Sequence, residues 1–337
     1  MAILITGIAG FIGSFAAKSL LERGEEIVGI DNLNDYYDPE LKKKRLAELK
    51  KLKNGKLHFS PIDFSDGALL NNTLEKFDFD RIIHLGAQAG VRYSLINPQI
   101  YGDSNLIGHL NILELARHRK VRHMVYASSS SVYGNRSTLP FKVDSQPDYP
   151  ASLYAATKRA GEMLSESYAY LYRIPLTGLR FFTVYGIWGP PDMAMWIFTK
   201  KILQKQPIML FNNGEMQRDF TYIDDAVSGL IAALDNPPQD NNKIKSGGSL
   251  NPHNLYNIGN HHPENLKYLV ELLEEACGCH AIKELRPMQA GDVSTTYADI
   301  ETSKRDLGFY PKDYAGYRSR PFCRMVSPLY HPFMKLL

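Results

Sequence analysis

The sequence predicts an α/β protein whose core is a doubly wound parallel sheet. Three observations point to it: short apolar runs without polar alternation, helical segments between these runs, and a glycine-rich turn after the first run. Strands that helices cover on both faces have this unbroken apolar pattern, because neither face meets water. With 337 residues, the chain is long enough for about two domains.

The first half of the chain alternates strands with helices. We expect strands at Ala2–Thr6, Glu26–Asp31, Lys56–Phe59, Arg81–Leu85, His123–Ala127 and Leu176–Phe182, and helices at Phe11–Arg23, Leu41–Lys53, Leu106–His118 and Ala155–Tyr170. Parallel strands need long crossover connections, and helices between the strands supply them. We read the basic helix Leu41–Lys53 as a solvated face beside the first strands.

The second half of the chain is less regular. We expect helices at Asp192–Gln204, Asp225–Leu234 and Asn265–Cys277, a strand at Ile208–Phe211, and a long exposed loop from Asn236 to His253. This pattern predicts a first domain at 1–182, to which the chain returns around 212–235, and a smaller α/β domain at 183–337. Prolines interrupt any helical period in 313–337, so we expect an atypical, irregular tail there.

Composition and charge exclude several kinds of protein. The 39 Lys and Arg residues and 36 Asp and Glu residues leave a net charge of +3, too weak a bias for a nucleic-acid binder. Three cysteines make no disulfide framework, which suits a reducing compartment. No run approaches the roughly 18 apolar residues of a membrane-spanning helix, and no histidine spacing resembles a zinc site. We therefore expect a cytoplasmic protein with no metal, membrane or nucleic-acid partner.

A glycine motif near the first residue predicts a dinucleotide site. Gly7, Gly10 and Gly13 lie between the first strand and the first helix. The first glycine permits a tight turn, the second lets the backbone approach a pyrophosphate, and the third allows close helix packing. Asp31 ends the second strand, where a carboxylate accepts hydrogen bonds from ribose hydroxyls and repels a 2′-phosphate. The motif thus predicts a Rossmann-type domain that prefers NAD to NADP.

Four further residues are assigned to the cofactor site. They are Phe11 and Ile12 inside the glycine motif, Asn32 after the second strand, and Asp63 after the third. Asp63 is a candidate for the adenine edge, and an ordinary surface acid is the alternative for it.

A second motif predicts base catalysis. Tyr154 and Lys158 are four residues apart, so they lie on one face of a helix. An ammonium group near a phenol favours the phenolate, and an oxidised nicotinamide acts in the same way, so we expect a lowered pKa for Tyr154. Ser129 lies in a run of serines at the carboxyl end of a strand, where ligands of such sheets bind.

Longer segments extend these motifs. They read DNLNDYYD at 31–38, HLGAQAGVRYS at 84–94, RFFTVYG at 180–186, RDFTYIDD at 218–225 and PMQAGD at 287–292. With them the chain resembles the extended short-chain dehydrogenase/reductase superfamily from about Ile3 to Lys312, and most of all its UDP-glucuronate 4-epimerases. The resemblance implies a tightly bound NAD that is regenerated in each turnover, a UDP-sugar substrate and a homodimer formed through two helices of each cofactor domain.

The resemblance also implies catalytic roles. Tyr154 removes the proton from the sugar O4 as hydride leaves C4, Lys158 orients Tyr154 and the nicotinamide ribose, and Ser129 bonds the sugar 4-OH. A 4-keto sugar then turns over in the site and receives the hydride on its other face.

Other residues are implied to hold the substrate. Arg218 matches an arginine that contacts the diphosphate, Asp292 a residue near the uridine ribose, and Phe211 a side chain that packs on the uracil. Arg92 is assigned to the same substrate site. A salt bridge, either between Arg218 and Asp292 or from each to another neighbour, is the alternative for these two residues.

A uronic acid substrate makes further demands. Its 4-keto form is a β-keto acid that loses carbon dioxide readily, so the site must hold the carboxylate out of line with the ketone. The resemblance assigns that task to Ser130, Ser131 and Thr183. The 4,6-dehydratases of this superfamily carry an Asp-Glu pair in place of Ser130 and Ser131, which argues against water elimination here.

One departure from the family keeps alternatives open. The family has Pro-Trp-Gly-Arg-Pro-Asp-Met-Ala where this chain has IWGPPDMA at 187–194, so Pro190 replaces an arginine. The loss of this arginine keeps open 4-epimerisation of a neutral UDP-hexose or UDP-N-acetylhexosamine. Decarboxylation of UDP-glucuronate and a non-catalytic NAD sensor are two further alternatives.

Overall fold

The larger part of the molecule is a parallel sheet. The structure is a computed structural model that describes residues 1–312 except 136, 146 and 290, so the predicted tail at 313–337 lies outside the described residues. In the described part, seven parallel strands stand in the order β10-β6-β5-β4-β1-β2-β3. Their bounds are β1 Ala2–Thr6, β2 Glu26–Ile30, β3 Lys56–Ser60, β4 Phe79–His84, β5 His123–Ser129, β6 Leu176–Phe181 and β10 His253–Ile258.

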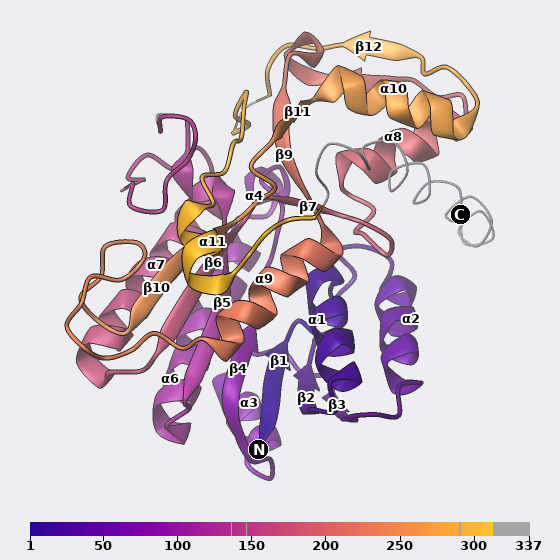
Figure 1. Ribbon diagram of the computed structural model, residues 1–337. Coiled ribbons are helices and arrows are strands. Elements are labelled where there is room, and N and C mark those ends of the chain that lie inside the picture. The colour runs from indigo at the N-terminus through magenta and orange to yellow at the C-terminus, as the bar shows by residue number, and fades with distance from the viewer. Residues whose placement is uncertain (136, 146, 290, 313–337) are drawn as a thin grey trace.

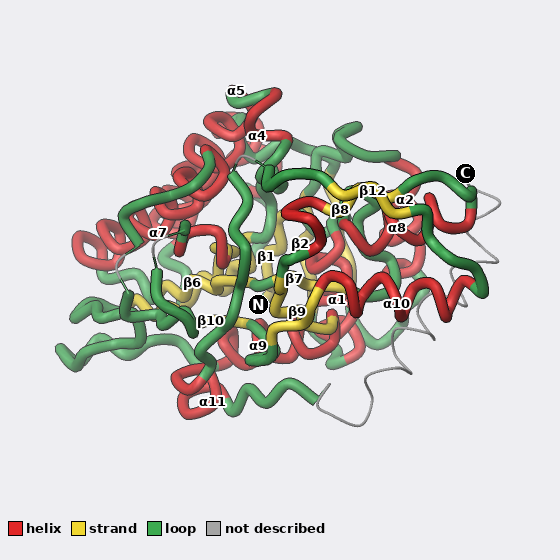
Figure 2. The backbone as a smooth tube through the Cα atoms, turned by 90° about the horizontal axis from the view of Figure 1, so that it is seen from above, coloured by secondary structure: helices red, strands yellow, loops and turns green. Residues whose placement is uncertain are grey.

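Helices cover both faces of this sheet (Figures 1 and 2). One face packs against α1 (Phe11–Glu22), α2 (Pro39–Lys50), α9 (Ile223–Asp235) and α11 (Glu301–Leu307). The other face packs against α3 (Gly67–Leu74), α6 (His109–Arg119) and α7 (Leu153–Tyr172). Short helices α4 (Tyr93–Ile96) and α5 (Gln99–Gly102) precede α6. The predicted doubly wound α/β fold is confirmed.

One strand of this sheet was missed by the sequence analysis. β10 follows the loop predicted at Asn236–His253 and pairs in register with β6. This strand is difficult to predict from sequence, because the polar residues His253 and Asn257 interrupt the apolar pattern of a buried strand. Their polar atoms are satisfied internally: His253 Nε2 lies 2.8 Å from the Tyr126 hydroxyl, and Asn257 Nδ2 donates to Phe141 O at 2.7 Å. The chain thus rejoins the large sheet in β10, while the division at residue 182 stays a prediction.

A smaller part stands at the carboxyl ends of the large sheet (Figure 1). It contains β7 (Thr183–Tyr185), β9 (Gln217–Tyr222) and β11 (Pro263–Asn265) in one sheet, β8 (Ile208–Leu210) and β12 (Lys283–Leu285) in another, and helices α8 (Ala194–Leu203) and α10 (Leu266–Cys277). These helices and β8 share an apolar core of their own. Within the described residues, no helix is both long and apolar enough to cross a membrane.

Several predicted bounds shift by a few residues. The helix predicted from Asp192 begins at Ala194, and the strand predicted through Phe211 ends at Leu210, where a 3-10 turn starts. The helix predicted at Leu106–His118 is α-helical only from His109, because residues 103–108 form a π-helical turn. Such turns often accompany functional sites.

Candidate active site

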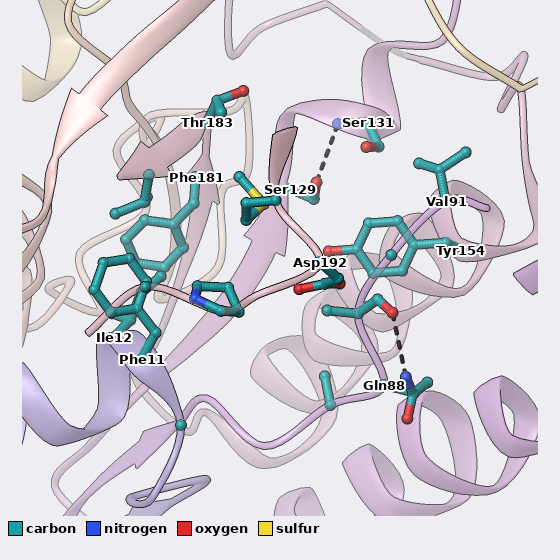
Figure 3. Close-up of a pocket in the computed structure, with 18 of the residues that line it drawn as sticks. Phe11, Ile12, Gln88, Val91, Ser129, Ser131, Tyr154, Phe181, Thr183 and Asp192 are labelled. Atoms are coloured by element: carbon teal, nitrogen blue, oxygen red, sulfur yellow. Dashed lines mark hydrogen bonds between the residues drawn. The ribbon is translucent and has the colours of Figure 1, made fainter. Parts of the chain in front are cut away.

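A cavity of about 660 Å³ runs from the carboxyl ends of the central strands to the smaller part of the molecule. Figure 3 shows part of its wall, which includes Ser129, Tyr154 and Thr183. The predicted site residues that line it are Gly7, Gly10, Phe11, Ile12, Gly13, Asp31, Asn32, Arg92, Ser129, Ser130, Ser131, Tyr154, Lys158, Thr183, Phe211, Arg218 and Asp292.

The glycine turn at one end of the cavity leaves no room for side chains. Gly7 has a φ of +69°, and a Cβ on it would lie 2.7 Å from the backbone nitrogen of Gly86. A Cβ on Gly13 would lie 2.1 Å from the carbonyl oxygen of Gly7. Helix α1 begins immediately after Gly10, so its N-terminal N–H groups are at the cavity wall. This bare backbone beside a helix N-terminus suits a pyrophosphate.

Asp31 is held by the backbone next to that turn. Its carboxylate accepts hydrogen bonds from the N–H groups of Ala9 at 3.1 Å and Leu33 at 2.9 Å. Burial raises the pKa of Asp31, and these hydrogen bonds together with the charge of Lys42 act in the opposite direction. Asp63 does not line the cavity; it accepts a hydrogen bond from Asn32 Nδ2 at 2.8 Å, so its contact with an adenine stays a prediction.

Lys42 is a cavity residue that sequence reasoning missed. The helix that carries it is predicted to have a solvated face, but the Lys42 side chain is buried. Its ammonium group donates hydrogen bonds to the backbone carbonyl of Asn34 at 2.9 Å and to the side-chain oxygen of the same residue at 2.6 Å. It lines the cavity close to Asp31. The signal in the sequence was its position a few residues after the DNLNDYYD segment.

Ser129, Tyr154 and Lys158 come together where β5 meets α7. Ser152 caps α7 by accepting the N–H of Ala155 at 3.1 Å, which places Tyr154 in the first turn of the helix. The Ser129 hydroxyl lies close to Tyr154 and accepts the N–H of Ser131 at 3.1 Å (Figure 3). A phenol and a hydroxyl therefore face the same cavity.

The electrostatics of this group differ from the expectation. Burial raises the pKa of Tyr154 above its ordinary value, and the nearby Ser129 hydroxyl only partly opposes that shift. The Lys158 ammonium donates to the carbonyl of Ala127 at 3.0 Å, and burial lowers its pKa to about 8. The protein alone therefore does not lower the pKa of Tyr154, because desolvation of the phenolate outweighs the neighbouring groups.

The far end of the cavity carries an arginine pair and an aromatic ring. The guanidinium of Arg92 lies 4.9 Å from the ring centroid of Phe211 and 3.5 Å from the Asp292 carboxylate. Arg218 donates to the backbone carbonyls of Gln217 at 2.9 Å and Ser294 at 3.2 Å. Asp292 thus pairs with Arg92 and offsets one of the two fixed positive charges at this end of the cavity.

Residues outside the predicted set attach the segment 187–194 to the loop after β2 and to helix α2. The Tyr36 hydroxyl donates to Asp192 Oδ2 at 2.8 Å, and Arg45 Nη2 donates to Trp188 O at 2.5 Å. Both partners belong to the segment that departs from the family pattern, and Pro190 lines the cavity between them. Sequence gave no signal for these pairings, since each joins residues more than 140 positions apart.

Comparisons with known proteins agree with this geometry. Residues 3–259 match the NAD dependent epimerase/dehydratase family. The chain is 44% identical over 319 residues to UDP-glucuronate 4-epimerase 6 of Arabidopsis thaliana, covering 92% of this chain and 68% of the relative. It is 43% identical over 317 residues to a probable UDP-glucuronate 4-epimerase of Rhizobium meliloti, covering 92% of each.

A solved structure shares the whole architecture. The crystal structure of UDP-glucuronic acid 4-epimerase from Bacillus cereus, in complex with UDP-glucuronic acid and NAD, has a TM-score of 0.85 and 32% sequence identity. The similarity covers 98% of this chain and 100% of that one. The resemblance to the nucleotide-sugar branch of the extended short-chain dehydrogenases/reductases is therefore confirmed, and the chain belongs to the NAD dependent epimerase/dehydratase family.

Proposed function

We propose that this protein is an isomerase that converts UDP-glucuronate to UDP-galacturonate by NAD-dependent 4-epimerisation. The observation that carries the proposal is the joining of a base site and a bare glycine turn in one cavity, within a chain similar to UDP-glucuronate 4-epimerases. A non-catalytic NAD sensor would have no need of Ser129, Tyr154 and Lys158 together in one cavity lining.

The residues present fit NAD. The glycine turn offers backbone and a helix N-terminus to the pyrophosphate, Asp31 offers a carboxylate to the ribose hydroxyls, and Lys158 offers an ammonium near the base. NAD, when bound, supplies the hydride acceptor for sugar C4 and returns the hydride to the opposite face. We assign Gly7, Gly10, Phe11, Ile12, Gly13, Asn32 and Asp63 to the same cofactor site, and expect the cofactor to stay bound through turnover.

Tyr154 moves the proton in this mechanism. In its phenolate form the side chain takes the proton of the sugar O4 and becomes a phenol, and it gives the proton back to O4 after the 4-keto sugar has turned. Ser129 lines the cavity close to Tyr154, and we assign it the hydrogen bond to the sugar oxygen when substrate is present. We assign Lys158, which lies one helical turn after Tyr154 and lines the same cavity, the task of favouring that phenolate by its positive charge.

Hydroxyl groups are assigned to the substrate carboxylate. Ser130 and Ser131 lie in the 3-10 turn after β5, and Thr183 begins β7 on the other side of the cavity. Hydrogen bonds from both sides would keep the carboxylate out of line with the C4 ketone and so slow decarboxylation. Arg92, Phe211, Arg218 and Asp292 are proposed to bind the uridine diphosphate at the far end.

Competing UDP-sugars test the proposed substrate. Purified protein is incubated in turn with UDP-glucuronate, UDP-glucose and UDP-N-acetylglucosamine, and the products are separated by chromatography. We expect UDP-galacturonate as the main product, with a higher kcat/KM than for either neutral sugar. A higher kcat/KM for a neutral sugar would favour the alternative that Pro190 keeps open. Release of a UDP-pentose would contradict the role of the serines and Thr183.

A homodimer is the proposed assembly. Exposed apolar side chains gather on α7 and the adjoining π-helical turn, where Ile107 is 52% exposed, Met163 64% and Leu171 58%. A two-fold dimer would cover the same patch on both copies.

We expect Met163→Glu to convert a dimer into a monomer in sedimentation measurements, because two carboxylates would be buried against each other. Ile244→Glu, at a 77% exposed position in the loop before β10, is the matched control and should leave the mass unchanged. A wild-type chain that sediments as a monomer would contradict the proposal.

We also propose a cellular compartment, a metabolic role and a domain division for this protein. The few cysteines favour the reducing cytoplasm, and a product such as UDP-galacturonate would serve the synthesis of surface polysaccharide. We keep the proposed domains at 1–182 and 183–337.

A further inference from the structure

Behind Tyr154 lies a second tyrosine that the mechanism does not use. Tyr101, in α5, is completely buried, and its ring lies 6.1 Å from the Tyr154 ring at an interplanar angle of 76°. This is the edge-to-face arrangement that aromatic pairs prefer. The ring of Tyr101 therefore packs directly against the ring of the proposed base.

The hydroxyl of Tyr101 is hydrogen-bonded to the loop at residues 88–90. It lies 2.8 Å from the carbonyl oxygen of Ala89 and 2.6 Å from that of Gly90, and donates its proton to this pair. The side-chain amide of Gln88 donates to the same Ala89 carbonyl at 3.3 Å. Residues 88–90 line the cavity, and Figure 3 shows Gln88 on the same side of the cavity as Tyr154. One side chain thus touches both the ring of Tyr154 and the loop in front of it.

The π-helical turn that follows Tyr101 makes a second connection between loop 88–90 and helix α7. Asn105 lies in the π-helical segment and bonds both backbone groups of Gln88, accepting its N–H at 2.8 Å and donating to its carbonyl at 3.0 Å. The same Asn105 amide donates to the Thr157 hydroxyl on α7 at 3.1 Å. Loop 88–90 and the helix that carries Tyr154 are therefore attached to one scaffold.

We propose that Tyr101 is a positioning residue for the epimerisation, which fixes the ring of Tyr154 while its hydroxyl anchors the loop at Ala89 and Gly90. The inference rests on the proposed role of Tyr154 as the base. A base must meet its proton within hydrogen-bond reach, and a displacement of about 1 Å can cost roughly 100-fold in rate. Tyr101 touches no substrate in this account, so its loss affects the rate and leaves binding nearly unchanged.

Tyr101→Phe is the informative variant because it keeps the ring contact and removes the anchor. We expect kcat to fall about tenfold while KM for the UDP-sugar stays within about twofold. Tyr126→Phe is the matched control, since Tyr126 is also buried and its hydroxyl is bonded, to His253 Nε2 at 2.8 Å, away from the cavity lining. The control should lose similar thermal stability and keep its kcat. Equal kcat values for the two variants would overturn the inference.

A measurement without turnover separates this inference from the proposed function. Tyrosine rings are labelled with carbon-13 at the hydroxyl-bearing carbon, and the Tyr154 signal is identified by its loss in Tyr154→Phe. We expect that signal to shift or to double in Tyr101→Phe and to stay in place in Tyr126→Phe. If the wild type fails to epimerise UDP-glucuronate, the proposed function falls, and the spectra still decide the role of Tyr101. An unmoved Tyr154 signal in Tyr101→Phe would overturn it.

Discussion

Tyr154→Phe is expected to lower the epimerisation rate about 1,000-fold, because positioned acid–base groups contribute roughly 100- to 10,000-fold. The substitution removes only the hydroxyl, so the ring still packs edge-on against Tyr101 and the helix α7 remains capped by Ser152. We expect the purified variant to keep its NAD content and its melting temperature. The measurement is kcat by product chromatography, together with the NAD released when the protein is heat-denatured.

Tyr126→Phe again provides the control for this change. It removes one buried tyrosine hydroxyl from β5 without touching the cavity lining, and should keep near-normal kcat. A Tyr154→Phe enzyme that retained activity within tenfold of the wild type would show that another group moves the O4 proton. A variant that lost NAD as well would point to a structural role for the phenol.

Gly13→Ala is expected to produce a protein without its cofactor. The new methyl would stand 2.1 Å from the carbonyl oxygen of Gly7, a distance that forces the turn or helix α1 to move. Such overpacking costs about 1–3 kcal/mol of stability, and the movement disturbs the backbone that faces the pyrophosphate. We expect far less NAD per chain after purification and a lower melting temperature. Both are measured on the same preparation.

Gly161→Ala is the matched substitution for this test. Gly161 also lies within a helix, but its new methyl would meet the His109 ring at 3.7 Å, an ordinary contact. This variant should retain the wild-type NAD content. Full NAD occupancy in Gly13→Ala would contradict the assignment of the glycine turn to the pyrophosphate.

The parts of the fold that sequence could predict are those with local causes. The strand Ala2–Thr6, the turn at Gly7 and the carboxylate of Asp31 follow one another within a short stretch, so pattern and spacing suffice. Tyr154 and Lys158 share one helix, and their common orientation follows from its period.

The parts that sequence missed depend on partners far along the chain. β10 is buried with polar side chains because Tyr126 and Phe141 supply hydrogen bonds from other elements. Lys42 is buried because Asn34 offers two acceptors, whereas its helix alone has the charge pattern of a solvated face. The raised pKa of Tyr154 likewise reflects the burial of its phenol, which residue spacing does not express.

The central claim is tested most directly by incubating the purified protein with UDP-glucuronate, with no added cofactor, while proton NMR follows the sugar signals. The account predicts that UDP-galacturonate appears, because NAD remains bound to the glycine turn and is regenerated in each turnover. Unchanged UDP-glucuronate, even after NAD is added, would contradict it.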